Sequence, residues 1–111
     1  NEKTIPQLRC EAVVGAANNQ LLTEECADLF SKRTILYVPD FIVNSGGLLN
    51  GVAELEATGY DPHRVRRHLD SVYKVLLSVF RLALERGEST EEVAVELAID
   101  RLERGVGARL D

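Results

Sequence analysis

Residues 34–38 read T-I-L-Y-V and run directly into Pro39-Asp40, and an earlier run, residues 11–17, reads E-A-V-V-G-A-A. Both runs are apolar and contain β-branched residues, and neither alternates with polar residues, which is typical of strands buried on both faces of a parallel sheet. The segment between them, T-E-E-C-A-D-L-F-S-K at residues 23–32, predicts a helix capped by Thr23. Strand, helix and strand in this order indicate a βαβ unit with parallel strands.

The chain after residue 44 is predicted to be helical. Ser45 could cap a first helix over about residues 46–58, and Gly59 would end it. Asp61-Pro62 then predicts a helix start, because Asp accepts from the first free N–H groups and Pro suits the first helical turn. We therefore expect an α/β fold in which the βαβ unit is followed by three helices.

The second and third of these helices carry the clearest signals. Apolar residues recur at steps of three and four from Val65 to Ala83, which predicts one long amphipathic helix that ends at Gly87. The sequence S-T-E-E that begins at Ser89 matches a capping box, with Glu92 three residues after the cap. A last helix is expected to begin there.

Composition limits the possible partners. The chain has 111 residues, a net charge of -5 and 45% hydrophobic residues, which predicts a folded domain without a basic surface for nucleic acid or an anionic membrane. It has no methionine, even at position 1, so we expect it to be part of a longer protein. The two cysteines, Cys10 and Cys26, lack nearby histidines, so we expect neither a disulfide framework nor a metal site, and a cytoplasmic setting.

Two loops are candidates for binding. Residues 15–20, G-A-A-N-N-Q, follow the first strand, and residues 39–47, P-D-F-I-V-N-S-G-G, follow the second. The carboxyl ends of parallel strands share one edge of a sheet, where α/β proteins bind ligands, so the two loops could frame one site. Small residues would allow a ligand to approach the backbone, and Gly46-Gly47 at a helix N-terminus could offer free N–H groups to an anion. Both loops are also ordinary turn and capping sequences, so the alternative is that they shape the turns and bind no ligand.

These loops resemble the C-terminal part of the glutamate/leucine/phenylalanine/valine dehydrogenase family. The resemblance rests on I-P-Q-L-R-C-E-A-V-V-G-A-A-N-N-Q-L at residues 5–21 and I-L-Y-V-P-D-F-I-V-N-S-G-G at residues 35–47, and continues through the helices to Arg104. It implies an oxidoreductase, an amino-acid dehydrogenase that deaminates an L-amino acid to the 2-oxo acid and ammonia, reversibly and with NAD, with NADP left open. It also implies that residues 1–44 end a Rossmann-like nucleotide domain, and that residues 45–111 are C-terminal helices that return toward a substrate domain.

The resemblance also implies roles for particular residues. Ala16, Ala17 and Asn18 match the segment that lines the nicotinamide end of the cofactor, and Asn44 matches an asparagine that contacts both the nicotinamide ribose and the substrate. Val72 and Val75 lie where leucine-type members line the pocket for the substrate side chain. Because those two valines are apolar, and no lysine or serine is expected beside them, we expect a leucine- or valine-like substrate rather than glutamate.

The chain departs from the family pattern by what it lacks. It has no glycine-rich phosphate-binding sequence, and the family's catalytic lysines and aspartate would lie upstream of residue 1, so the chain alone is expected to be inactive. The incomplete sheet has an open edge, which favours a homo-oligomer. One alternative is a non-catalytic interaction or oligomerisation module derived from this family. Another is a different nucleotide-dependent α/β enzyme, which would need both loops to coincide by chance.

Overall fold

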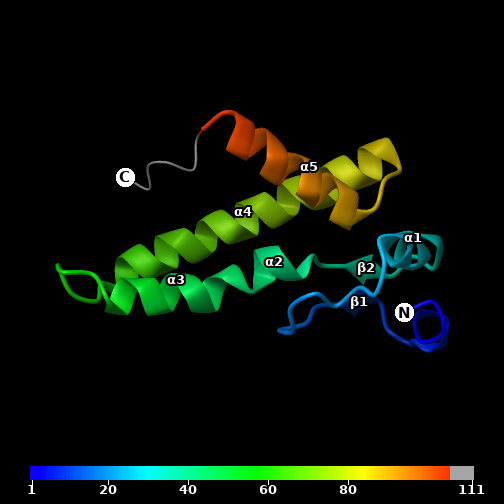
Figure 1. The fold of residues 1–111 in the computed structure, drawn as a ribbon, viewed down its shortest axis with the longest axis horizontal. Coiled ribbons are helices and arrows are strands. Elements are labelled where there is room, and N and C mark those ends of the chain that lie inside the picture. The colour runs from blue at the N-terminus through cyan, green and yellow to red at the C-terminus, as the bar shows by residue number, and fades with distance from the viewer. Residues whose placement is uncertain (106–111) are drawn as a thin grey trace.

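The computed structural model describes residues 1–105, apart from the side chains of residues 49 and 50. A short 3-10 helix, η1 (Ile5–Gln7), leads into strand β1 (Ala12–Val13), helix α1 (Glu25–Lys32) and strand β2 (Leu36–Tyr37). The remaining elements are helices α2 (Asp40–Val43), α3 (Ser45–Glu54), α4 (Pro62–Arg86) and α5 (Thr90–Glu103). The fold is therefore mixed α/β, with a small parallel sheet followed by helices (Figure 1).

The two strands pair in parallel, as predicted. Ala12 is in register with Leu36 and Val13 with Tyr37, and the backbone N–H of Val38 donates to the carbonyl of Val13 at 3.0 Å. The predicted strands were longer, over residues 11–17 and 34–38. Each has only two residues in the ladder, because among residues 1–105 each strand pairs only with the other.

Among the described residues, the sheet is covered on one face only. Tyr37 is buried and its ring stacks on Phe30 of α1, with ring centroids 5.0 Å apart. On the other side, Leu36 is 41% exposed and Val14, just after β1, is 60% exposed. One face of the sheet therefore packs on α1, and the other is largely open in the part of the chain that the structure describes. The first core contains Ile5, Cys26, Phe30, Ile35 and Tyr37.

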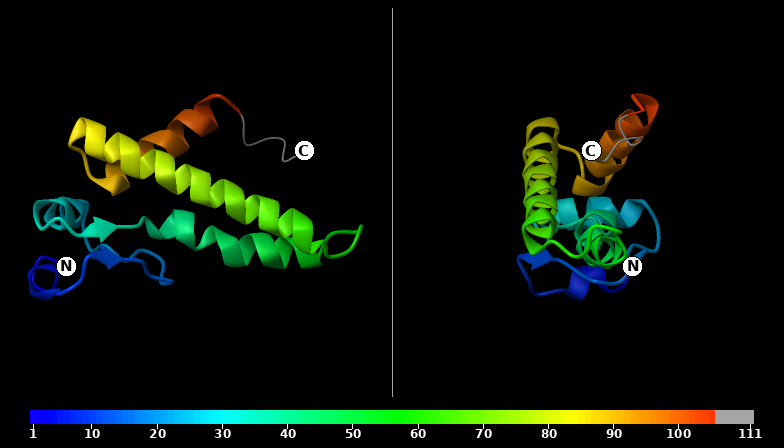
Figure 2. Two further views of the ribbon diagram at one scale, coloured as in Figure 1. Left: turned by 180° about the vertical axis from the view of Figure 1, so that it is seen from behind. Right: turned by 90° about the vertical axis from the view of Figure 1, so that its left-hand side faces the viewer.

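Helices α3 and α4 form a hairpin that extends away from the sheet, and α4 runs back along α3 and α2 (Figures 1 and 2). The start of α4 is as predicted, since the Asp61 side chain accepts from the N–H of His63 at 2.9 Å. Its predicted end is also confirmed, because Gly87 adopts a left-handed conformation with φ 68°. The second core lies between α4 and α5 and contains Val79, Ala83, Val93 and Ala94.

Three predicted caps had different outcomes. The capping box of α5 is present, with Glu92 N–H donating to Ser89 Oγ at 3.2 Å and Ser89 N–H donating to Glu92 Oε2 at 3.0 Å. The predicted cap at Thr23 is wrong, because α1 begins at Glu25 and the Thr23 hydroxyl lies beside the thiol of Cys26. The predicted cap at Ser45 is also wrong, because its hydroxyl donates to the carbonyl of Ile42.

Helix α2 was not predicted, since residues 39–47 were expected to be a loop. It begins right after Pro39 and runs into α3 with only Asn44 between them, in a helical conformation with φ -73° and ψ -11°. Helix α3 then ends at Glu54, earlier than the expected residue 58. The chain thus turns from the sheet into the helical hairpin through a nearly continuous helical segment.

Candidate functional site

The structure brings together the two loops that follow the strands. Asn44, at the junction of α2 and α3, donates from Nδ2 to Asn18 Oδ1 at 2.8 Å and to the carbonyl of Ala17 at 3.3 Å. Asn18 and Ala17 are exposed, as is Ala16, whereas Asn44 is half-buried. The sequence-predicted residues Ala16, Ala17, Asn18 and Asn44 therefore lie in one cluster at the carboxyl edge of the sheet.

Contrary to expectation, Gly15 and Gly46 in these loops serve packing and do not open space for a ligand. A Cβ built on Gly15 would lie 2.3 Å from Gln20 Nε2, so the space beside Gly15 is filled by the Gln20 side chain and not open to a ligand. Gly46 and Gly47 lie in the first turn of α3 and follow α2, so they do not form the open helix N-terminus expected for an anion. A Cβ on Gly46 would come 3.2 Å from Leu69 Cδ2, so Gly46 allows α3 to pack closely on α4.

A buried acidic group lies beside this cluster. Asp40, the first residue of α2, is 9% exposed, and its Oδ2 accepts from the N–H of Gln20 at 2.9 Å. Burial, with the nearby Asp40 and Glu91 carboxylates, raises the pKa of the Tyr37 hydroxyl to about 12. Burial and the Asp40 carboxylate also raise the pKa of Glu91, whose Oε2 is buried and has no hydrogen-bond partner among the described residues. These groups line a hollow of about 310 Å³.

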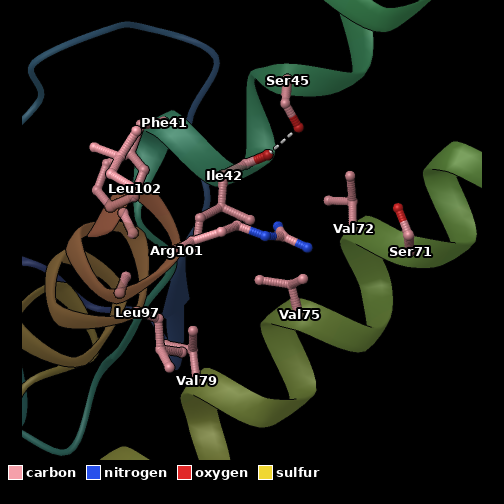
Figure 3. A pocket seen from close by; sticks show the side chains of 12 residues that line it. Phe41, Ile42, Ser45, Ser71, Val72, Val75, Val79, Leu97, Arg101 and Leu102 are labelled. Carbon is pink, nitrogen blue, oxygen red and sulfur yellow. Dashed lines mark hydrogen bonds between the residues drawn. The ribbon is translucent and has the colours of Figure 1, made fainter. Parts of the chain in front are cut away.

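Val72 and Val75 line a second hollow, of about 420 Å³, between α2, α4 and α5. Figure 3 shows their side chains facing Ile42 across it, and the Arg101 side chain reaching from α5 toward them. Asn44 does not line this hollow, although the next residue, Ser45, does. The predicted cofactor residues and the predicted substrate valines thus occupy neighbouring surfaces on either side of the α2–α3 junction.

The expectation that no serine or lysine lies beside these valines is wrong. Ser71 lines the same hollow as Val72 and Val75, and Lys74 and Val75 line an adjoining hollow. The wall remains mainly apolar, because Phe41, Ile42, Val79 and Leu97 contribute to it.

Sequence reasoning gave no role in the site to Asp40 or Arg101. Asp40 could have been found from its place directly after a buried strand and a proline, where a carboxylate at a helix start can reach the preceding loop. Arg101 could have been found from its spacing of four after Leu97, which places a charged residue on the apolar side of α5.

The described residues offer neither a metal site nor a membrane-spanning helix. Within residues 1–105, no group of three or more histidine, cysteine, aspartate or glutamate side chains is placed to hold a metal ion. None of the helices described is both long enough and apolar enough to span a membrane.

Comparison with known proteins decides the family. The sequence profile for glutamate/leucine/phenylalanine/valine dehydrogenase matches residues 1–108. This chain belongs to that family. The resemblance inferred from the two loops is thereby confirmed.

Relatives within the dehydrogenase family differ in their amino acid. The chain is 40% identical over 103 residues to an L-tryptophan dehydrogenase of Nostoc punctiforme. The aligned segment covers 92% of this chain and 29% of that protein. It is 38% identical to a phenylalanine dehydrogenase and 35% identical to a leucine dehydrogenase, both of Thermoactinomyces intermedius, covering 94% and 93% of this chain and 28% of each relative.

A solved structure supports the same relationship. The crystal structure of L-tryptophan dehydrogenase from Nostoc punctiforme superimposes with a TM-score of 0.80 at 39% identity, covering 94% of this chain and 31% of that one. The chain thus spans less than a third of the dehydrogenases that it matches.

Proposed function

We propose that the complete protein containing this segment is an amino-acid dehydrogenase that reversibly deaminates an apolar L-amino acid to its 2-oxo acid and ammonia with NAD or NADP. The proposal rests above all on the cluster of Asn18, Asn44 and the Ala17 carbonyl at the carboxyl edge of the parallel sheet. Family membership and the matched amino-acid dehydrogenases support it. A bound nicotinamide cofactor would supply the hydride acceptor.

The hydrogen bonding of the cluster suits a nicotinamide end. Within residues 1–105, the Asn18 Nδ2 group donates to no partner and Asn44 Oδ1 accepts from none. The two side chains therefore leave one donor group and one acceptor atom unused, and a carboxamide or a sugar hydroxyl can pair with groups of either kind. We assign Ala16, Ala17, Asn18 and Asn44 to cofactor binding, and Asn44 also to the substrate.

Val72 and Val75 are proposed to contact the substrate side chain. Their support is the mainly apolar wall of the hollow that they line. Leucine or valine stays our prediction within the apolar class, and aromatic amino acids are the competitors that the tryptophan and phenylalanine dehydrogenases suggest. Glutamate competes as well, because Arg101 and Ser71 give the hollow polar groups that could receive a carboxylate.

The proposal includes the organisation of the complete protein. Residues 1–44 would end a Rossmann-like nucleotide domain with a βαβ unit, and residues 45–111 would be C-terminal helices that lead toward a substrate domain, the last six lying outside the described residues. The catalytic groups would belong to the rest of the protein, so this chain alone would be inactive. We further propose a homo-oligomer, supported by the open face of the sheet, and a cytoplasmic setting, supported by the free Cys10 and Cys26 thiols.

The test uses the complete protein, NAD or NADP, and a panel of L-leucine, L-valine, L-phenylalanine, L-tryptophan and L-glutamate. We expect reduced nicotinamide to form, seen by its absorbance, with one or more apolar amino acids and not with the D-enantiomers. Asn44→Ala should lower kcat/KM by roughly 10- to 100-fold, since it removes hydrogen bonds in a binding site. Leu84→Ala, on an 86% exposed side chain of α4, is the matched control.

Two outcomes would contradict the proposal. A folded complete protein without turnover for any amino acid on the panel would favour the non-catalytic module. Turnover by the isolated 111-residue chain would show that the catalytic groups are not where we place them.

A further inference from the structure

The loop over residues 15–20 is closed by one side chain. Gln20 Nε2 donates to the carbonyl of Ala17 at 2.9 Å, so its carboxamide folds back across the loop. The same carboxamide fills the space beside Gly15, where any Cβ would lie within 2.7 Å of its atoms. Asn19, between them, has a positive φ of 53°, a conformation that asparagine tolerates better than most residues. Gln20 therefore sets the shape of the loop that presents Asn18.

Asp40 attaches this loop to α2. Its buried carboxylate accepts from the backbone N–H of Gln20 at 2.9 Å across 20 residues of sequence. Asp40 also shares one helical turn with Asn44, whose backbone N–H donates to the Asp40 carbonyl at 2.8 Å. One rigid turn thus carries both the carboxylate that anchors the loop and the asparagine that contacts Asn18.

The result is a fixed orientation of the Asn18 carboxamide. The Ala17 carbonyl can only accept, so the Asn44 atom that faces it must be the Nδ2 donor. The Asn18 atom that faces the same Nδ2 at 2.8 Å must then be the oxygen. The NH₂ group of Asn18 is left without a partner among the described residues, available as a donor.

We propose that Asp40 and Gln20 are positioning residues, which hold the loop so that Asn18 offers its NH₂ group to an acceptor oxygen of the nicotinamide cofactor. The identity of that ligand rests on the proposed function. In this proposal neither residue contacts the ligand: Gln20 acts through the Ala17 carbonyl, and Asp40 acts through the backbone N–H of Gln20. Asp40→Asn keeps an acceptor oxygen for the Gln20 N–H and should preserve the arrangement, whereas Asp40→Ala and Gln20→Ala remove a hydrogen bond that holds it.

The first experiment measures binding of NADH and NADPH to the complete protein by fluorescence titration. For Asp40→Ala and Gln20→Ala we expect a Kd raised about tenfold or more, the loss typical of a hydrogen bond to a buried charged or constrained group. Asp40→Asn should restore the Kd to near that of the unmodified protein. Asp61→Ala is the matched control, since it removes the side-chain cap of α4 at the end of the helical hairpin, away from the sheet, and should lower stability without changing the Kd.

The second experiment needs no ligand. Amide hydrogen exchange in the complete protein should show a protected Gln20 N–H in the unmodified and Asp40→Asn forms, and a fast one in Asp40→Ala. If the unmodified protein binds neither nucleotide, the proposed function fails. Hydrogen exchange alone then tests whether Asp40 anchors the loop through the Gln20 N–H. If it binds nucleotide and the Kd of Asp40→Ala is unchanged, or if Gln20 exchange is the same in all forms, the positioning role is refuted.

Discussion

Replacing Val79 with alanine tests whether the contact between α4 and α5 holds the wall of the apolar hollow. Val79 is fully buried, packs with Val93 and Ala94 of α5, and also lines the hollow. Alanine lacks two of the carbon atoms of valine, which corresponds to roughly 1.6 kcal/mol of lost burial, at 0.8 kcal/mol per methylene. The cavity that remains adds to this, so we expect a loss of about 2 kcal/mol in the free energy of unfolding.

The assay is urea denaturation of the chain followed by circular dichroism. A loss of about 2 kcal/mol lowers the ratio of folded to unfolded molecules about 30-fold. With the slopes usual for small domains, the urea midpoint should fall by about 1 M. Leu84→Ala is the control, because it removes more atoms from the same helix at a side chain that is 86% exposed, and should change stability by less than about 0.5 kcal/mol. Equal losses for the two variants would refute the packing argument, since burial would then not decide the effect.

Two other predictions concern α5. Ser89→Ala removes the capping box and should lower the free energy of unfolding by about 1 kcal/mol, measured by the same denaturation; no loss would mean that the cap does not stabilise the helix. Glu91→Gln tests the raised pKa of Glu91. Because that pKa is higher in the folded state, the protonated carboxyl stabilises the folded chain below pH 4.5, and this stabilisation is lost as the pH rises through the folded-state pKa. The glutamine variant should therefore gain stability relative to the unmodified chain between pH 4.5 and neutrality, and a constant difference over this range would contradict the assigned pKa shift.

Signals contained within a few residues predicted the helical part of the fold. The start of α4 at Asp61-Pro62, its end at Gly87 and the capping box at Ser89 all follow from contacts between residues no more than four apart, which the sequence displays directly. The βαβ order and the parallel pairing were predicted from the succession of a strand, a helix and a strand, although the paired residues lie 24 positions apart. Thr23 does not cap α1, because its hydroxyl contacts the Cys26 thiol.

Features that depend on distant residues were not predictable in this way. Helix α2 was expected to be a loop, since Pro39 and the glycines are typical turn residues, and only the fold shows that Asp40 anchors the loop 20 residues before it. The meeting of Asn18 and Asn44 was expected from the common edge of parallel strands, but the direction of their hydrogen bond depends on the Ala17 carbonyl. Likewise, the Gln20 side chain that fills the space beside Gly15 could not be inferred from residue size alone.

The placement of Asn44 between α2 and α3 connects the edge of the sheet to the helical hairpin. Helix α3 has 10 residues and so forms an arm about 15 Å long that starts at this residue. Asn44 is itself helical, with φ -73° and ψ -11°, so the direction of this arm and the position of the Asn44 side chain are set together. The packing of α3 on α4, which fixes this arm, therefore also fixes the residue that binds Asn18 and the Ala17 carbonyl.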